Sequence, residues 1–559
     1  MQVRLDAQVI SNNGAAVTIT PGAAVVTKDM TNTSGAGTAR FLNNGTINMS
    51  GNFTNNVSSV TSGDGTYRLG GNWTNPGTFS WGLSTVIFNG SAEQLITKPS
   101  PETFYRLSVE NTGTGLSQTV RLDNIVQVIG YIDLKSGNIT ATGYKLQLVN
   151  QAAASLNYTS STKSRIYGQF ERGVGQAGNY LFPMGNIARP TYYNPANLIT
   201  NTTPTVGSVL TEFLLSPAPV QIIPPLPDPP VEVDSVYTAG YWSMTARNGF
   251  ATSNYSVTLD AEGFTNSLDT VRDITRVVKR TGAGSWVLDG VHSDATGTVV
   301  KRNNLTGNIS SAGTSFALGR ANPLITTHPA DLIVCEMTYP TFTVVATGAE
   351  PLTYLWYKDG SPILSGPHYT GNRSATLVIN EAVLSDAGNY YCVVRDRYRN
   401  TTISTSATLT VNKIPVATLT PAAQDHECSE VPFDDIVLGL SYYNPGTIFT
   451  WSRTTPAGIN TTIPVTGTEN NIGDVLAGSF QNTTDAPITI TFEIIPIGPA
   501  PTYCTGLPIY ATITVNPRPR VIPVMKQICY GESTSITLVS PSTMTQDNVI
   551  RFDYNITAT

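Results

Sequence analysis

The sequence predicts an all-β protein in which a β-solenoid-like N-terminal domain is followed by tandem β-sandwiches. The chain has 559 residues, enough for about four domains of roughly 150 residues each. Its 48 glycines and 36 prolines accompany many Asn, Thr and Ser residues, a composition typical of turns between short strands. A segment near the N-terminus recurs after 20 residues, which is the kind of period that coiled repeat folds use.

The composition also excludes several classes of function. Charged residues make up 13% of the chain and the net charge is -6, so the positive excess needed to bind a phosphate backbone is missing and we expect no nucleic-acid partner. No apolar run reaches the roughly 18 residues of a membrane span, and the first ten residues lack the apolar core of a signal peptide. Residues 551–559 end within an alternating strand pattern. We therefore expect a soluble fragment of a longer protein, with no membrane span in it.

Residues 1–153 are predicted to form the β-solenoid-like domain. Gly45–Asn55 and Gly65–Asn75 match at their glycine, asparagine, threonine and large apolar positions. A repeat of this length cannot bury its own apolar side, so successive copies must stack to form a core. An ordinary sandwich of hairpins is the alternative. In the solenoid, the side chains expected to point inward are those of Met49, Leu69 and Phe88.

Residues 154–322 lose the short period and are predicted to form a larger antiparallel sandwich. Alternating segments indicate its strands: Arg165–Phe170, Tyr241–Ala246, Tyr255–Leu259, Ile274–Lys279 and Ser315–Gly319. The segment Pro217–Pro230 holds seven prolines in fourteen residues. Because proline has no amide hydrogen to donate to a strand ladder, we expect this segment to be an extended surface loop.

Residues 323–412 carry the most specific pattern in the chain. Trp356 lies in a strand-like segment, and Asp386, Gly388, Tyr390 and Cys392 complete a D-x-G-x-Y-x-C sequence. This block resembles an immunoglobulin-like domain. The resemblance implies that Trp356 packs at the sandwich centre and that Tyr390 makes the corner hydrogen bond, with Asp386 and Gly388 completing the motif. The sequence departs from the family in having Val344 where the first core cysteine is expected.

Residues 413–516 are predicted to form another sandwich of about a hundred residues. Its strand-like segments are Pro415–Pro421, Phe449–Trp451, Pro487–Ile494 and Ile513–Pro517. The block is similar to a PKD-like domain. Residues 517–559 are expected to begin a further, truncated sandwich.

The cysteines predict disulfide bonds rather than a metal site, because none of them forms a C-x-x-C pair. Two lie in each of two neighbouring blocks, which favours one bond per domain, Cys335 with Cys392 and Cys428 with Cys504. Cys529 would then have its partner outside this fragment. Such bonds persist only in an oxidising compartment and indicate an extracellular protein. Buried free thiols are the alternative that the sequence leaves open.

The coil, sandwich, Ig-like and PKD-like blocks, together with Tyr180–Gly185 and Phe316–Gly319, resemble the large multidomain surface proteins of gliding and related Bacteroidota. This resemblance implies export by the type IX secretion system and a role as a cell-surface adhesin or filament component. The C-terminal sorting domain of that family is missing from the fragment. Asp234–Val236 and Asp269–Val271 are similar to the phylum's O-glycan attachment motif, which implies glycans at Ser235 and Thr270.

Catalytic and cofactor-binding motifs are missing from the sequence. The four histidines (His292, His328, His368 and His426) lie in polar stretches, and no fingerprint of a hydrolase, metalloprotease, P-loop or dinucleotide site occurs. A polysaccharide lyase or hydrolase on the solenoid would need clustered charges on successive coils. Residues 41–97 carry only three charged side chains: Asp64, Arg68 and Glu93.

A glycan-binding module is the second alternative, with exposed tryptophans as stacking platforms. The candidates are Trp73, Trp81 and Trp286. Trp73 replaces Phe53 in the repeat, so an interior position is the prediction for that ring. The sequence therefore predicts a non-enzymatic, extracellular protein without a cofactor, an elongated cell-surface adhesin or filament segment. Its partners would be the secretion machinery and a surface ligand, with a glycan among the candidates.

Overall fold

The computed structural model describes residues 2–4, 8–35, 37–215, 222–265, 270–421, 424–442, 444–545 and 549–557. Strands dominate these residues, and their helices are short 3₁₀ turns (η1, Gly115–Ser117; η2, Ala153–Ser155; η3, Ser160–Thr162; η4, Leu384–Asp386). The predicted all-β class is confirmed. The chain divides into two compact units, the first made of residues 1–324, 347–352 and 395–401 and the second of the rest.

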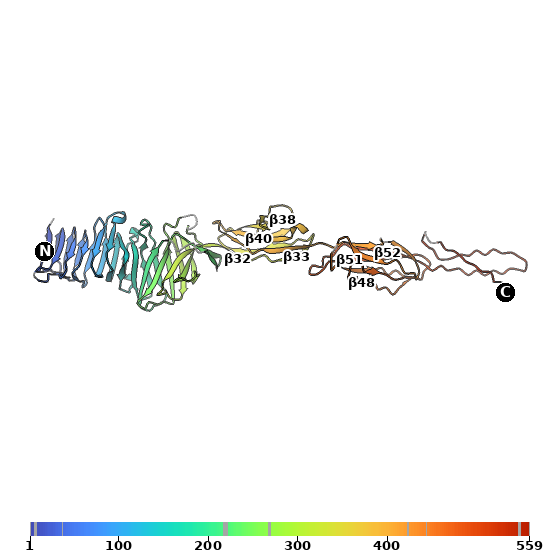
Figure 1. Cartoon of the computed structure of the whole chain (residues 1–559), viewed down its shortest axis with the longest axis horizontal. Coiled ribbons are helices and arrows are strands. Elements are labelled where there is room, and N and C mark those ends of the chain that lie inside the picture. Colours follow the sequence, from blue (N-terminus) through green and yellow to red (C-terminus); the bar gives the residue numbers. More distant parts are fainter. Residues whose placement is uncertain are drawn as a thin grey trace. The chain divides into compact units, whose positions relative to one another are not determined.

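The N-terminal part of the first unit is a stack of β-coils with parallel strand pairing, seen as the blue arrows in Figure 1. Thr46 pairs with Thr66, and Phe53 pairs with Trp73. This register reproduces the 20-residue repeat and confirms the solenoid-like prediction over the sandwich of hairpins. The strands are β1 (Gln2–Arg4), β2 (Val9–Asn13), β3 (Ala16–Ile19), β4 (Ala24–Thr27), β5 (Asp29–Thr33), β6 (Arg40–Asn43), β7 (Thr46–Met49), β8 (Phe53–Asn55), β9 (Val60–Ser62), β10 (Thr66–Leu69), β11 (Trp73–Thr74), β12 (Thr78–Ser80), β13 (Thr85–Phe88), β14 (Gln94–Thr97), β15 (Glu102–Glu110), β16 (Thr119–Leu122), β17 (Val126–Ser136), β18 (Asn138–Leu148) and β19 (Leu156–Tyr158).

Apolar side chains fill the inside of the coils. Met49, Leu69 and Phe88 are buried as predicted. The ring of Trp73 is fully buried and stacks on Phe53 at a centroid distance of 4.0 Å. Because each coil repeats the position of the one before, the same kinds of side chain meet along the stack, and the core is continuous.

A row of buried asparagines runs along the inside of the same stack. Side-chain amides connect Asn12 to Asn32, Asn32 to Asn55 and Asn55 to Asn75, at 2.8, 2.9 and 2.8 Å. Asn75 then donates to Glu102 at 2.6 Å. Neighbouring parallel strands lie about 4.8 Å apart, so an amide can donate to the coil above and accept from the coil below. The ladder therefore satisfies polar groups that would otherwise be costly to bury.

Strand β20 (Ile166–Val174) joins the coils to the sandwich. It pairs in parallel with β18 on one side and antiparallel with β24 (Gly207–Leu214) on the other. One sheet and one core therefore continue across residue 153, and the domain boundary placed there stays a prediction. The other strands of the sandwich are β21 (Gly178–Phe182), β22 (Met184–Gly185), β23 (Ala196–Thr200), β25 (Ile222–Asp228), β26 (Val231–Val236), β27 (Tyr241–Arg247), β28 (Asn254–Asp260), β29 (Arg276–Thr281), β30 (Val291–Thr296), β31 (Val299–Thr306) and β32 (Thr314–Thr327).

The proline-rich segment differs from its prediction. Ile222–Asp228 forms β25, which pairs antiparallel with β26, whereas the sequence predicted a loop outside any ladder. Among the described residues β25 has this one neighbour, and an edge strand is where a sheet tolerates proline. Residues 217–221 of the segment lie outside the described residues.

The Ig-like block consists of two sheets. Their strands are β33 (Leu332–Cys335), β36 (Thr353–Lys358), β37 (Ser361–Pro362), β40 (Gly388–Arg395), β41 (Thr401–Ile403) and β42 (Ala407–Asn412) in one, and β34 (Thr341–Thr343), β38 (Tyr369–Thr370) and β39 (Thr376–Ile379) in the other. A short strand, β35 (Val345–Thr347), lies between β34 and β36 in the sequence. Trp356 is fully buried between the sheets.

The next block has its own core around Trp451, Phe480 and Phe492. Its strands are β43 (Ala417–Thr420), β44 (Gln424–Cys428), β45 (Ile436–Leu440), β46 (Ile448–Arg453), β47 (Ile459–Asn460), β48 (Thr466–Glu469), β49 (Val475–Leu476), β50 (Gln481–Asn482), β51 (Ile488–Ile497) and β52 (Ile509–Asn516). No strand or helix is assigned to the described residues after 516. The further sandwich expected in residues 517–559 stays a prediction.

Candidate functional site

A polar pocket lies where the last coils meet the sandwich in the first unit. Its volume is about 700 Å³. Strands β18, β20, β24 and β27 contribute its walls, and we call it the junction pocket. The lining residues that matter here are Tyr144, Lys145, Gln169, Glu171, Glu212 and Arg247.

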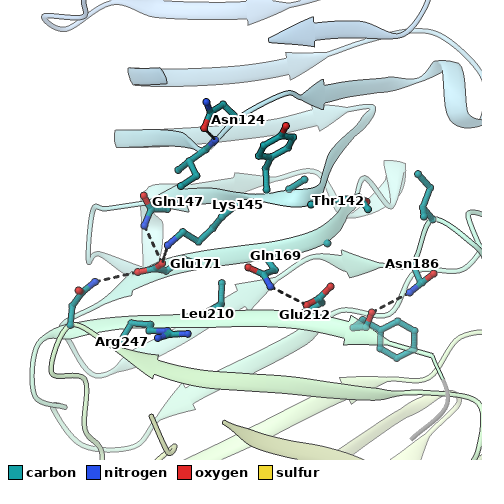
Figure 2. A pocket seen from close by; sticks show the side chains of 18 residues that line it. Asn124, Thr142, Lys145, Gln147, Gln169, Glu171, Asn186, Leu210, Glu212 and Arg247 are labelled. Carbon is teal, nitrogen blue, oxygen red and sulfur yellow. Dashed lines mark hydrogen bonds and ion pairs between the residues drawn. The ribbon is translucent and has the colours of Figure 1, made fainter. Parts of the chain in front are cut away.

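Strand register brings the polar side chains of the junction pocket to one face. Lys145 of β18 pairs with Gln169 of β20, and Gln147 pairs with Glu171. Residues that face each other on paired strands project to the same side of a sheet. Figure 2 accordingly shows Lys145 and Gln147 directed at Glu171, and Gln169 directed at Glu212 of β24.

A three-residue bulge forms another wall of the pocket. Ala141 pairs with Gly168, whereas Lys145 pairs with the next residue, Gln169, so the residues 142–144 leave the ladder. A side chain on Gly168 would lie 2.8 Å from the backbone of Ala141, which explains the glycine there. The bulge places Tyr144 on the pocket wall with 42% of its surface exposed, consistent with the way bulges re-aim side chains near functional sites.

Glu171 is buried and is held by four side chains. Lys145 Nζ, Gln147 Nε2, Ser208 Oγ and Asn248 Nδ2 donate to its carboxylate at 2.7, 3.0, 2.7 and 3.2 Å. Burial alone would raise the pKa of this carboxyl, but the bonds from Lys145, Ser208 and Gln147 lower it below its ordinary value. Glu171 is therefore a fixed, ionised anchor in the pocket.

Glu212, the other acidic residue of the pocket, differs from Glu171 in its hydrogen bonds and in the direction of its pKa shift. Among the described residues, one side chain donates to its carboxyl group, Gln169 Nε2 at 3.5 Å, and burial raises its pKa above the ordinary value. Arg247 lines the same pocket, is exposed, and forms no ion pair with a side chain in the described part of the chain. These two groups are therefore free to contact a ligand, and hydroxyl-rich molecules match their donor and acceptor atoms.

Sequence reasoning missed this pocket. The charge count covered residues 41–97, whereas the charged lining residues lie between 145 and 247. The available signal was an acid within an otherwise apolar strand pattern, as in Phe170–Arg172 and Thr211–Phe213. Among the described residues, no group of three or more His, Cys, Asp or Glu side chains is placed to hold a metal ion.

Two of the three tryptophans considered as stacking platforms are too buried to contact a glycan. Trp73 and Trp286 are buried, and Trp81 is partly buried against the core. The two residues expected to carry glycans are both half-buried. Ser235 lies within strand β26, and Thr270 lies outside the strands. Asp269 lies outside the described residues. Glycosylation of Ser235 and Thr270 stays a prediction.

The Ig-like corner is built around Asp386. Tyr390 is buried, and its hydroxyl donates to the carbonyl of Asp386 at 2.7 Å. The Asp386 carboxylate accepts from the Val383 amide at 2.8 Å, from Tyr369 at 2.7 Å and from His368 at 2.9 Å. Gly388 has a φ of +154°, and a side chain there would meet the Asp359 carboxylate at 2.4 Å. The position therefore requires glycine.

We expect acid to destabilise the Ig-like domain through Asp386. Burial opposes ionisation, but the Val383 amide, His368 and Tyr369 hold the pKa of this carboxyl below its ordinary value. A lowered folded-state pKa stabilises the domain above the unfolded pKa of about 3.9, and this contribution is lost as pH falls through the folded value. The urea concentration at which half of the slowly exchanging amides of β40 lose their protection should therefore be lower at pH 3 than at pH 6. Asp386→Asn should show a smaller pH-dependent change, and an equal change in both proteins would contradict this account.

The disulfide pairings expected from the sequence are wrong. Cys335 is bonded to Cys504, while Cys392, Cys428 and Cys529 are free thiols. Cys392 is buried on β40, and burial raises its pKa to about 12. Its usual partner position in an Ig-like core is occupied by Val344, so no thiol is there to pair with it. Cys335 lies instead at the end of β33, beside the start of the following domain.

The Cys335–Cys504 bond is part of a packed junction within the second unit. Asn412 Nδ2 donates to Thr502 Oγ1 at 2.9 Å, and the amide of Ile414 donates to Glu336 Oε1 at 2.8 Å. The ammonium of Lys413 lies 3.9 Å from the ring centroid of Tyr442. Linker residues 412–414 therefore contact both the Ig-like domain and the domain that follows it.

Comparisons with known proteins identify one family within the chain. Residues 322–396 match the model of the immunoglobulin domain. A 47-residue stretch is 45% identical to Hemicentin-1 of Mus musculus, covering 8% of this chain and 1% of that protein. An 84-residue stretch is 40% identical to the Decoration protein of Escherichia phage T5, covering 15% of this chain and 48% of that protein. The chain thus spans less than half of the length of either relative.

Solved structures with similarity include titin domain M7, which is 32% identical, covers 16% of this chain and 94% of its own, and has a TM-score of 0.15. The structure titled Rst D1-D2 is 16% identical, covers 35% of this chain and 100% of its own, and has a TM-score of 0.22. The family and sequence matches fit a multidomain protein of the extracellular type that contains an immunoglobulin-like domain. In the described residues, no helix has the length and apolar character needed to cross a membrane.

Proposed function

We propose that this chain is a non-enzymatic structural and adhesive segment of an extracellular protein, displayed on the cell surface. Within this proposal the domain after the Ig-like one is PKD-like, and the type IX secretion system exports the whole protein. The resemblance to the surface proteins of gliding Bacteroidota supports the export route. The immunoglobulin-domain match at residues 322–396 supports a binding or spacing role for that module.

The observation that carries the proposal is the Cys335–Cys504 bond between successive domains. Disulfides persist in oxidising surroundings, which supports an extracellular location. Because this bond joins two domains and not two strands of one core, its main effect is to hold the junction at residues 412–414 closed under load. A protein that transmits tension between a cell and a surface benefits from such a covalent tie.

Reducing the bond is expected to loosen the junction. A cross-link across a separation of 169 residues stabilises a chain by about 5 kcal/mol in the loop-entropy model. Cys335→Ser should therefore lower the unfolding temperature of the second unit and speed proteolysis at the linker after Asn412. Cys428→Ser is the matched control, because Cys428 is an exposed free thiol, and it should change neither quantity.

The location is tested on intact cells that produce the full-length protein. An antibody against residues 323–412 should label unpermeabilised cells, and non-reducing peptide mapping of the surface protein should recover the Cys335–Cys504 peptide pair. Alkylation of Cys335 and Cys504 without reductant, or labelling only after permeabilisation, would refute the proposal.

A further inference from the structure

We infer that the junction pocket binds a neutral carbohydrate chain. This assignment rests on the pocket alone and does not depend on the proposed surface role. The volume of about 700 Å³ lies within the range of about 300 to 1,000 Å³ that is typical of small-molecule sites. The wall residues supply hydrogen-bonding groups for the hydroxyls of a sugar and an aromatic side chain for the C–H face of its ring.

The charges of the pocket favour a neutral ligand. Lys145 is neutralised by Glu171 at 2.7 Å, so this ammonium is not available to attract an acidic sugar. The remaining lining charges, Glu212 and Arg247, are of opposite sign. A polyanionic ligand requires a surplus of positive side chains, and the pocket has none.

The lining side chains keep open hydrogen-bonding atoms of both kinds, donors and acceptors. Gln169 and Glu212 end in planar groups with two polar atoms each, and Arg247 ends in a planar fork of donors. Gln147 and Gln169 each donate one amide hydrogen to a glutamate, and no side chain in the described part of the chain donates to their carbonyl oxygens. The hydroxyls of a bound sugar chain, which both donate and accept, can therefore donate to these oxygens and accept from Arg247.

Tyr144 supplies the apolar contact. The bulge at residues 142–144 lifts it out of the strand ladder, and 42% of its surface remains exposed. In the described residues its hydroxyl has no hydrogen-bond partner. An aromatic face of this kind packs against the C–H side of a pyranose ring while the hydroxyl remains wet. The bulge thus has a function that a regular strand would not provide.

The pocket is arranged to bind the chain and not to cleave it. Glycoside hydrolysis uses two carboxyl groups, one that donates a proton and one that attacks or activates water. Cleavage would require Glu171 as the second carboxyl beside Glu212, but both oxygens of Glu171 already accept hydrogen bonds, from Lys145, Gln147, Ser208 and Asn248. A carboxylate clamped in this way is a poor nucleophile or base, so Glu171 positions the walls instead.

The test uses the full 559-residue chain in isothermal titration calorimetry. The probes are neutral hexasaccharides of glucose, xylose, mannose and N-acetylglucosamine, with oligogalacturonate and a chondroitin sulfate hexasaccharide as acidic counterparts. At least one neutral probe should bind with a Kd between about 1 μM and 1 mM. Tyr144→Ala and Gln169→Ala should each weaken that binding about tenfold or more, the effect expected for central contacts of a site.

Tyr131→Ala is the matched control, because Tyr131 is also a partly exposed tyrosine of the coils but lies outside the pocket. Unchanged binding is expected for it. Gln169 and Tyr144 are exposed, so both variants should keep the circular dichroism spectrum and unfolding temperature of the parent chain.

Three outcomes would overturn the inference: no binding of any neutral probe, binding of the acidic probes only, or binding that Tyr144→Ala and Gln169→Ala leave intact. New reducing ends after incubation with a probe would show that the chain cleaves it, and the pocket would then be a catalytic site and not a binding site. Cell-surface labelling and recovery of the Cys335–Cys504 peptide pair do not involve the pocket, so failure of sugar binding leaves the proposed function standing.

Discussion

Replacing Trp73 with alanine is expected to cost the first unit about 3 to 5 kcal/mol of unfolding free energy, the usual range for a buried tryptophan. The ring is fully buried, stacks on Phe53 and meets Phe104 edge-on at 5.4 Å. Its Nε1 also donates to the Glu102 carboxylate at 2.8 Å. The substitution therefore opens a cavity and removes one donor from a buried charge, and both effects destabilise the fold.

Urea unfolding followed by far-ultraviolet circular dichroism measures this loss. Trp81→Ala is the control, because Trp81 lies at the edge of the same core and is only partly buried. Its loss should be less than half that of Trp73→Ala. Equal losses for the two variants would contradict the central position of Trp73 in the coil core.

Asn55→Ala is expected to cost about 3 kcal/mol, because buried polar groups that lose their partners are each penalised by about 1 to 3 kcal/mol. The Asn55 amide donates to Asn75 Oδ1 at 2.8 Å and to the carbonyl of Thr78 at 3.0 Å. Its oxygen accepts from Asn32 at 2.9 Å and from Thr61 at 3.0 Å. Alanine leaves these groups buried with fewer partners.

Asn72→Ala is the matched control for the ladder. Asn72 lies at a coil corner, where its side-chain oxygen accepts one hydrogen bond, from the amide of Leu95 at 2.9 Å. Water can replace that contact, so a loss of about 1 kcal/mol or less is expected. The same unfolding measurement applies, and a loss for Asn55→Ala no larger than for Asn72→Ala would show that the buried ladder contributes little.

Trp73→Ala and Asn55→Ala test two features of the 20-residue repeat, its apolar core and its buried asparagines. The sequence predicted the solenoid because glycine, asparagine and large apolar residues recur at one spacing, and Met49, Leu69 and Phe88 are indeed inside. It did not predict that the recurring asparagines at 32, 55 and 75 form a buried ladder. Asparagine is common both in exposed corners and in such ladders, so residue type alone does not separate the two environments.

The disulfides show a different limit. The sequence predicted one disulfide within each of two domains, because near neighbours in sequence are the simplest partners, and Cys392 and Cys428 are instead free thiols. The bond that forms links Cys335 to Cys504, since β33 ends beside the following domain. Which thiols meet depends on where strands end in space, and a pairing of this range has no local signature.

The sequence by itself determined the all-β class, the stacking period of the coils and the Ig-like block, because each depends on residue patterns that are local along the chain. The tertiary structure alone decided the junction pocket and the interdomain disulfide. Lys145, Glu171, Glu212 and Arg247 line one pocket because β20 pairs in parallel with β18 and antiparallel with β24, and β24 in turn pairs with β27. Such a meeting depends on strand register between distant segments, and register is set by the packing of the whole sheet.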